Sequence, residues 1–168
     1  ASRNPIMFRK ILIANRGEIA MRIIRGCREL NIATAAIYSE ADSSGIYVKK
    51  ADESYLVGPG PVKGFLDGKQ IVEIAKRIGA DAIHPGYGFL SENTKFARLC
   101  QTSGITFIGP SPETIDLMGS KVKARQIAQQ AGVPIVPGTE GGVTSVDEAL
   151  AFAHQINYPV MIKASAGG

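Results

Sequence analysis

Arg-Lys-Ile-Leu-Ile-Ala-Asn-Arg-Gly-Glu-Ile-Ala, residues 9–20, joins a short apolar run to a glycine-containing turn and then to a new apolar pattern. After Gly17, apolar residues recur at the spacing of one face of an amphipathic helix: Ile19, Ala20, Ile23, Ile24, Cys27 and Leu30. A short buried strand that leads directly into a helix is the first half of a βαβ unit.

The same alternation continues to about residue 119. Further strands are expected at 33–38, 54–57, 80–84 and 105–108. Helices are expected at 69–79, from an N-cap at Ser91 to near Gly104, and after Ser111; the polar segment 39–53 holds a turn and one short helix. Strands that alternate with helices at this spacing predict an α/β fold, a doubly wound parallel sheet with helices on both faces.

The pattern changes after Gly119. Residues 121–131 are helical and polar, 133–137 are extended, Ser145 caps a helix that reaches Ile156, and 159–163 are expected to form a strand. The last residues, 164–168, are the beginning of a glycine-rich loop. We therefore expect a domain boundary near Gly119 and a truncated second domain after it.

Composition excludes several classes of protein. With 168 residues, 45% hydrophobic and 20% charged, the chain has room for one domain, or one domain and the start of another, and is not a disordered tail. The net charge is +4, but the basic residues are dispersed, which argues against a nucleic-acid partner. No apolar run approaches the ~20 residues of a membrane span. Residues 1–7 have no apolar signal region and are interpreted as a leader or a remnant of expression.

Four residues could bind a metal or form a disulfide: Cys27, Cys100, His84 and His154. Two cysteines do not make a disulfide framework, and no two of the four stand at the close spacing of a zinc site. The sequence therefore predicts reduced cysteines and no metal site.

The turn at 14–18 stands where a dinucleotide-binding fold carries Gly-x-Gly-x-x-Gly, but two of those glycines are missing. The alternative to a dinucleotide-binding loop is a tight turn in which Arg16 and Glu18 make structural ion pairs or a subunit contact. Gly68-Lys69-Gln70 is not a Walker motif, because Lys63 stands in place of the first glycine and Gln70 in place of Ser or Thr.

Residues 84–93, His-Pro-Gly-Tyr-Gly-Phe-Leu-Ser-Glu-Asn, follow a parallel strand, where doubly wound sheets place their ligands. His84 is either a site residue or a hydrogen-bonded histidine that holds this loop, and the absence of an assignable catalytic partner favours the second reading. Lys163 precedes glycines, so it could meet phosphate oxygens or could simply be solvated.

Several motifs closely resemble biotin carboxylase, the ATP-grasp component of the biotin-dependent acetyl-CoA, propionyl-CoA, methylcrotonyl-CoA and pyruvate carboxylases. They are residues 11–20, 51–53, 84–93, 107–110, 131–134 and 158–168, in order and at the family's spacing. The resemblance runs from about residue 8 to the last residue.

The resemblance implies a Rossmann-like domain at 8–119 and the beginning of an ATP-grasp domain at 120–168. It implies a ligase that uses MgATP to activate bicarbonate and then carboxylates biotin on a carrier domain. The implied partners are the biotin carboxyl carrier, a carboxyltransferase and a second copy in a homodimer. The implied location is the cytoplasm, or the mitochondrial matrix in a eukaryote.

Site residues are carried over by position. The resemblance assigns Lys121, Lys163, Gly167 and Gly168 to ATP, Tyr87 to the biotin pocket, and Arg25 and Glu29 to the subunit interface. The family's magnesium-binding glutamates, bicarbonate-binding residues and catalytic base lie beyond residue 168, so no catalytic residue is expected here. One departure is Ser120 in Met-Gly-Ser-Lys, where the family usually has aspartate.

Two alternatives stand beside this reading. One is another ATP-grasp ligase, of the carbamoyl-phosphate or purine-pathway type, and the other is a non-catalytic scaffold or dimerisation module. The segment 84–93 favours biotin carboxylase over the other ATP-grasp ligases, and the scaffold reading applies to the 168-residue chain taken by itself. The acceptor of the carboxyl group is chosen by the carboxyltransferase and is not specified by these residues.

The 168-residue chain by itself is expected to show no bicarbonate-dependent ATP hydrolysis, with or without free biotin. Phosphoryl transfer needs metal ions and positive charge around the γ-phosphate, and the family's metal-binding carboxylates lie outside this sequence. Phosphate release by the purified chain measures it. Turnover that Lys163→Ala abolishes would contradict the expectation.

Overall fold

The computed structural model describes residues 8–139 and 141–163. Internal contacts divide the chain into two compact units, Ala1–Pro112 and Glu113–Gly168. Residues 1–7, interpreted from the sequence as a leader or a remnant of expression, and the glycines at 167 and 168 lie outside the described residues.

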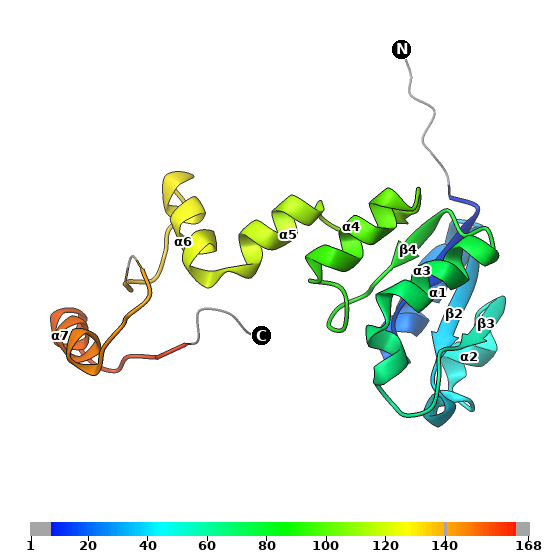
Figure 1. Ribbon diagram of the computed structural model, residues 1–168, viewed down its shortest axis with the longest axis horizontal. Helices are drawn as coiled ribbons and strands as arrows, with labels where there is room; N and C mark the ends of the chain where they lie inside the picture. Colours follow the sequence, from blue (N-terminus) through cyan, green and yellow to red (C-terminus); the bar gives the residue numbers. More distant parts are fainter. Residues whose placement is uncertain (1–7, 140, 164–168) are drawn as a thin grey trace, which may run out of the picture. The chain divides into compact units, whose positions relative to one another are not determined.

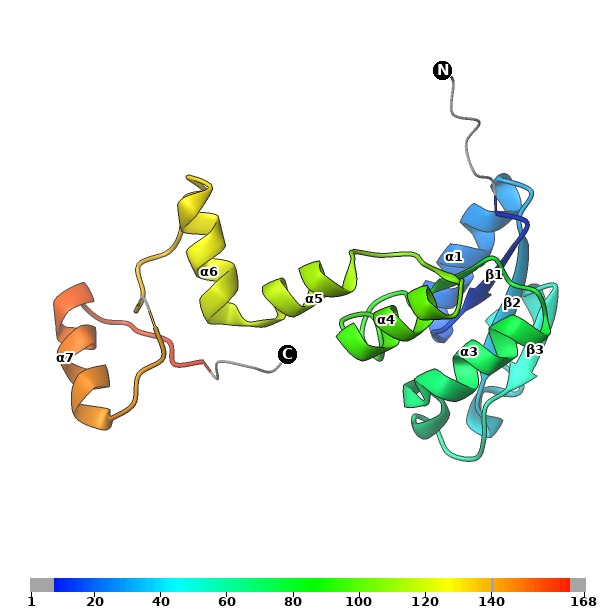
Figure 2. The same cartoon turned by 45° about the horizontal axis from the view of Figure 1, so that its top comes forward.

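The first unit is built on a five-stranded parallel sheet in the order β3-β2-β1-β4-β5 (Figures 1 and 2). The strands are β1 Lys10–Ile13, β2 Ala33–Tyr38, β3 Glu53–Leu56, β4 Ala82–His84 and β5 Thr106–Phe107. Leu12 of β1 is in register with Ala35 on one side and Ile83 on the other. The parallel pairing of all neighbours confirms the predicted α/β sheet.

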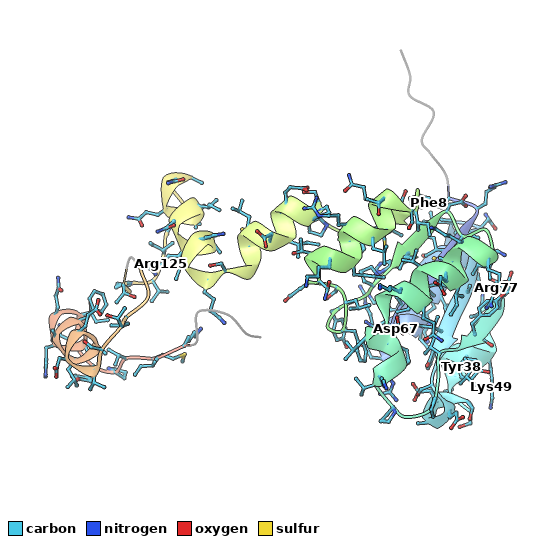
Figure 3. The ribbon with its side chains drawn as sticks, viewed as in Figure 1. Phe8, Tyr38, Lys49, Asp67, Arg77 and Arg125 are labelled. Atoms are coloured by element: carbon cyan, nitrogen blue, oxygen red, sulfur yellow. The ribbon has the colours of Figure 1, made fainter. Side chains whose placement is uncertain are left out.

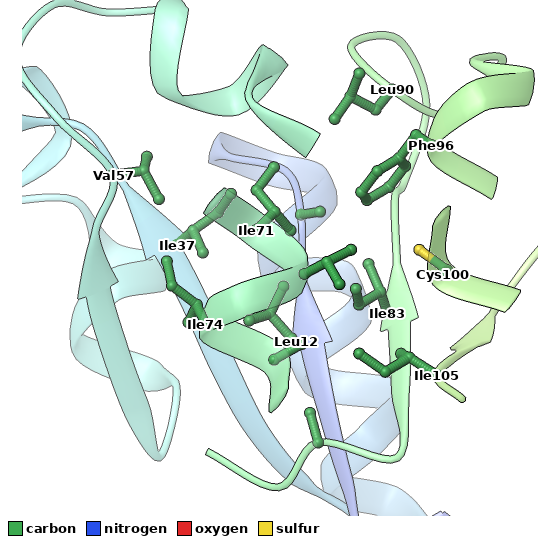
Figure 4. Packing of buried hydrophobic residues seen from close by; sticks show 14 of the residues in the cluster. Leu12, Ile37, Val57, Ile71, Ile74, Ile83, Leu90, Phe96, Cys100 and Ile105 are labelled. Carbon is green, nitrogen blue, oxygen red and sulfur yellow. The ribbon is translucent and has the colours of Figure 1, made fainter. Parts of the chain in front are cut away.

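Helices cover both faces of this sheet, so the doubly wound prediction is also confirmed. The first unit contains α1 Gly17–Glu29, η1 Glu40–Asp42, α2 Ile46–Lys50, η2 Lys63–Leu66, α3 Gly68–Arg77 and α4 Thr94–Thr102. One buried cluster joins α1 and α2 to the sheet, and includes Ile13, Ile24 and Tyr47. The other joins α3 and α4 to the opposite face, around Leu12, Ile71, Ile83 and Phe96 (Figure 4).

Hydrogen bonds at the helix N-termini correct two predicted boundaries. α3 begins at Gly68, where the carboxylate of Asp67 accepts from the backbone N–H of Gln70 at 3.0 Å (Figure 3). The predicted cap of α4, Ser91, is wrong: Asn93 caps this helix and accepts from the backbone N–H of Phe96 at 2.9 Å. The N–H of Ser91 instead donates to the carbonyl of Gly88, so the chain makes a turn there before the helix starts.

The second unit is helical in its described residues. It contains α5 Pro112–Gly119, which begins at the unit boundary, α6 Lys121–Gln130 and α7 Val146–Ile156. Ser145 caps α7 as predicted, since its hydroxyl accepts from the N–H of Glu148 at 3.1 Å. The guanidinium of Arg125 donates to the carbonyls of Val136 and Gly138, at 2.6 and 3.3 Å, and so fastens the extended segment to α6 (Figure 3).

The strand predicted at 159–163 is wrong, because these residues carry no regular secondary structure. A strand needs a neighbour for its backbone amides and carbonyls, and no strand of the described second unit supplies one. Met161 and Ile162 are 79% and 85% exposed.

Leu12→Ala is expected to lower the free energy of unfolding of the first unit by about 3–5 kcal/mol, because Leu12 is fully buried at the centre of the sheet and its removal leaves a cavity. Leu30→Ala is the matched control: Leu30 is 61% exposed, so a change within about 0.5 kcal/mol is expected. Urea denaturation compares the two variants. Equal losses would contradict this assignment of the core.

Candidate functional site

Two loops meet at the carboxyl edge of the sheet, where the central strands β1 and β4 end side by side. The backbone N–H of Ala14 donates to the carbonyl of His84 at 2.9 Å, so the parallel pairing continues to the last residue before each loop. The turn 15–18 follows β1, and the loop 85–90 follows β4. This edge is where doubly wound sheets bind ligands.

Asn15 joins these two loops. Its side chain is buried, with 2% of the residue exposed. The Nδ2 group donates to the carbonyls of Pro85 and Tyr87, both at 2.7 Å, while Oδ1 accepts from the N–H of Arg16 at 2.9 Å. A buried polar group is stable only when it is hydrogen-bonded, and here the amide is satisfied entirely by the backbone of the two loops.

Gly86 permits the close approach of the loop to Asn15. Its φ of +63° is a conformation that side chains with a Cβ rarely adopt. A Cβ at this position would also lie 2.7 Å from Nδ2 of Asn15. Glycine is therefore required by both the backbone and the packing.

His84 makes a further hydrogen bond to the same loop. Its Nδ1 accepts a hydrogen bond from the N–H of Gly86 at 3.0 Å, which identifies the neutral ring with its proton on Nε2. Burial lowers the pKa of His84, in keeping with that neutral form. These contacts confirm the reading of His84 as a histidine that holds the loop.

Tyr87 lies at the exposed tip of the loop, with 60% of the residue accessible. Its hydroxyl donates to a carboxylate oxygen of Glu18 at 2.6 Å. Hydrogen bonding to that carboxylate raises the pKa of Tyr87. Glu18 therefore contacts the tyrosine rather than forming the predicted ion pair in the described part of the chain.

Arg16 turns away from this loop toward η1. Its guanidinium makes a two-point contact with the carboxylate of Asp42, including a bond from Nε at 2.5 Å, and the hydroxyl of Tyr47 donates to the same carboxylate at 3.0 Å. The bond from Arg16 lowers the pKa of Asp42, and burial raises the pKa of Tyr47. The structural ion pair predicted for Arg16 is confirmed.

A groove of about 860 Å³ runs along α1 beside α2. Arg25 and Glu29, assigned by resemblance to a subunit interface, line it together with Glu18, Arg22 and Ile46. Ile46 is 67% exposed. The structure therefore places Arg25 and Glu29 on one face of α1.

The positions that the resemblance assigns to ATP lie in the second unit. Lys121 is the first residue of α6, next to Ser120, whose hydroxyl accepts from the N–H of Lys123 at 3.4 Å. Serine and aspartate are both favourable N-caps, so the departure at Ser120 preserves the helix start. Lys163 is exposed at the end of the described residues, and Gly167 and Gly168 lie outside them.

No three His, Cys, Asp or Glu side chains gather closely enough to hold a metal ion in residues 8–139 and 141–163. Among the helices of these same residues, none combines the length and apolar character that a membrane span requires.

Sequence reasoning missed Asn15 and Asp42. Asn15 could have been noticed as an amide directly after an apolar strand, where a buried polar group needs partners. Asp42 carries no comparable signal, because it stands in a polar segment and meets Arg16 only through the fold.

A parallel five-stranded sheet with helices on both faces and two joined loops at its carboxyl edge defines a doubly wound α/β domain. Residues 7–115 match the family model "Biotin carboxylase, N-terminal domain", which covers more than half of the sequence. The chain belongs to the biotin carboxylase N-terminal domain family. Residues 120–168 match the model "Carbamoyl-phosphate synthase L chain, ATP binding domain".

Known relatives agree with this assignment. The chain is 58% identical over 163 residues to a biotin carboxylase of Halalkalibacterium halodurans, covering 96% of this chain and 36% of the relative. It is 54% identical to the 2-oxoglutarate carboxylase small subunit of Hydrogenobacter thermophilus, with 96% and 34% covered. The chain thus spans about a third of the length of these relatives.

Solved structures show the same fold. The biotin carboxylase domain dimer of the Hydrogenobacter thermophilus 2-oxoglutarate carboxylase, solved with MgADP, ADP and bicarbonate, has a TM-score of 0.91 at 54% identity over 96% of this chain and 36% of that one. A Campylobacter jejuni biotin carboxylase, solved as a β-γ-ATP complex, has a TM-score of 0.93 at 45% identity over 99% of this chain and 37% of that one.

Asp42→Asn is expected to reduce stability at pH 7 by about 1–2 kcal/mol, because Arg16 loses a charged partner. The folded-state pKa of Asp42 is depressed, so its contribution is present above the unfolded pKa of about 3.9 and is lost as the pH falls through the folded value. The variant and the parent should therefore converge in acid.

Urea denaturation at several pH values between 7 and 2 tests this. Asp116→Asn, at an exposed position of α5, is the matched control and should change the free energy of unfolding at pH 7 by no more than about 0.5 kcal/mol. A constant difference between Asp42→Asn and the parent at all pH values would be inconsistent with the ion pair.

Proposed function

We propose that the protein to which this chain belongs is a biotin carboxylase, a ligase that uses MgATP and bicarbonate to carboxylate biotin on a carrier domain. The observation that carries the proposal is the match of residues 7–115 to the biotin carboxylase N-terminal model, supported by 58% identity to a biotin carboxylase along 96% of the chain. Alone, the chain is expected to be inactive, since it spans about a third of such a protein.

In this proposal the first domain is 8–119, the ATP-grasp domain begins at 120, and 1–7 are a leader or expression remnant. The two family models, which end at 115 and begin at 120, support a boundary in this interval.

Lys163 is proposed to bind ATP as a positive charge beside its phosphates, and Lys121 to contact the phosphates or the ribose of ATP. Gly167 and Gly168 are proposed to belong to the loop that covers the phosphates. The exposure of Lys163 fits this role, because its ammonium is accessible to a ligand. When bound, MgATP supplies the phosphoryl group that activates bicarbonate. Tyr87 is proposed to line the biotin pocket, and its exposure at the sheet edge supports that position.

The proposed partners are the biotin carboxyl carrier, a carboxyltransferase and a second copy of the same chain. Arg25 and Glu29 are assigned to the contact between copies, supported by the groove on α1 and by a relative solved as a dimer. The proposed location is the cytoplasm, or the mitochondrial matrix in a eukaryote; bacterial and mitochondrial relatives are compatible with either.

A second candidate is a ligase of the carbamoyl-phosphate type, because residues 120–168 match an ATP-binding model named after carbamoyl-phosphate synthase. Both candidates use an ATP-grasp domain, so residues 120–168 do not separate them. The full-length protein separates them directly. With ATP, a biotin carboxylase bonds the labelled carboxyl group of bicarbonate to biotin and releases ADP and phosphate, whereas the alternative needs a nitrogen donor.

Lys163→Gln in the full-length protein is expected to lower kcat/KM for ATP about ten- to a hundred-fold, because losing one charge-assisted hydrogen bond costs roughly 1.5–3 kcal/mol. A ground-state contact would raise KM, whereas a contact to the moving phosphoryl group would lower kcat. Steady-state kinetics with a melting curve measures both.

Lys76→Gln, an exposed position on α3, removes the same charge and should leave the kinetics unchanged. Parental kcat and KM for ATP in Lys163→Gln would refute the assignment of Lys163.

A further inference from the structure

Tyr87 is exposed, but the residues on either side of it are packed against the domain. On one side of it Pro85 is buried, and on the other Leu90 is 5% exposed. Phe89 stacks on Phe65 of η2, with ring centroids 5.2 Å apart. The residues that flank the tip are therefore buried or half-buried, whereas Tyr87 and Gly88 are exposed.

The strongest anchor comes from outside the loop. Both hydrogens of the Asn15 amide are used on carbonyls that flank Gly86, those of Pro85 and Tyr87. One of these carbonyls belongs to Tyr87 itself, so Asn15 fixes the position of the Tyr87 backbone relative to the end of β1. An aspartate would have the same shape but no hydrogen to donate, and would face two carbonyl oxygens.

A second contact fixes the direction of the ring. The Tyr87 hydroxyl donates to Glu18 at 2.6 Å, a charge-assisted bond that reaches 69 residues along the sequence. Glu18 occupies the first turn of α1, and that helix begins with Gly17 at a φ of +62°. The turn after β1 thus supplies both contacts, one to the backbone and one to the side chain of Tyr87.

We infer that Asn15 and Glu18 are positioning residues for Tyr87, Asn15 by fixing the loop and Glu18 by orienting the phenol. The inference rests on the proposed function, in which Tyr87 lines the biotin pocket. A ring held in place before the ligand arrives does not lose rotamer freedom on binding, so affinity and alignment both improve. Neither residue contacts biotin in this proposal; each acts through Tyr87.

Asn15→Asp in the full-length protein tests the first half. Loss of the two donors should speed hydrogen–deuterium exchange of the peptide that spans 84–90, and should lower kcat/KM for free biotin about ten-fold with KM for ATP unchanged. Asn93→Asp is the matched control. It makes the same chemical change near the same loop, but Asn93 acts as an acceptor, which aspartate retains.

Glu18→Ala tests the second half and leaves the core untouched, because Glu18 is exposed. It should lower kcat/KM for biotin in the parent and have no further effect in a Tyr87→Phe background, since the hydroxyl is then absent. Glu18→Gln keeps an acceptor oxygen and should recover part of the loss. Equal effects of Glu18→Ala in both backgrounds would overturn the role of Glu18.

The variants give different results if the positioning role is wrong than if the proposed biotin pocket is wrong. If Tyr87→Ala leaves kcat/KM for biotin unchanged, the proposed biotin pocket is wrong and the inference falls with it. If Tyr87→Ala lowers that value but Asn15→Asp and Glu18→Ala do not, the pocket stands and the positioning role is overturned. Unchanged exchange of 84–90 in Asn15→Asp would also overturn the role of Asn15.

Discussion

The burial of β1 on both faces and both edges is the constraint on which the first unit depends. Its backbone pairs with β2 and β4, and Leu12 and Ile13 are fully buried on opposite faces, one in each core cluster. A strand placed in this way cannot shift by one residue without exchanging the two clusters. The end of β1, and with it Asn15, is therefore held next to the end of β4, and the meeting of the two loops follows from this register.

The turn after β1 has a different use here from that of a dinucleotide-binding loop. In that motif the glycines leave room for a pyrophosphate, whereas here the space beside the turn is occupied by protein. Arg16 is held by Asp42, and Asn15 is held by carbonyls of the 85–90 loop. The turn therefore has a structural use, which is to hold the neighbouring loop. This use does not need the glycines of the Gly-x-Gly-x-x-Gly motif, so the motif is missing although the sheet is doubly wound.

One helix connects two regions of interest. Glu18 lies in the first turn of α1 and touches Tyr87, while Arg25 and Glu29 lie further along the same helix and line its groove. A helix is a stiff element whose residues three and four apart share a face, so these side chains belong to one surface. In the proposed carboxylase, α1 therefore carries both the residues assigned to the subunit contact, Arg25 and Glu29, and the residue that orients Tyr87, which is Glu18.

The sequence by itself determined the alternation of strands and helices, because buried strands and amphipathic helices have different hydrophobic periods that need no knowledge of distant residues. It also indicated the family, through motifs that are continuous along the chain. Only the tertiary structure decided that Asn15 bonds to carbonyls 70 and 72 residues away and that Glu18 meets Tyr87. It likewise moved the cap of α4 from Ser91 to Asn93 and left 159–163 without a strand. The physical reason is that a hydrogen bond forms only between groups that the folded chain brings within about 3 Å of each other. For residues in loops that follow different strands, this proximity is set by the order and register of the strands in the sheet. No local sequence pattern contains that order or register.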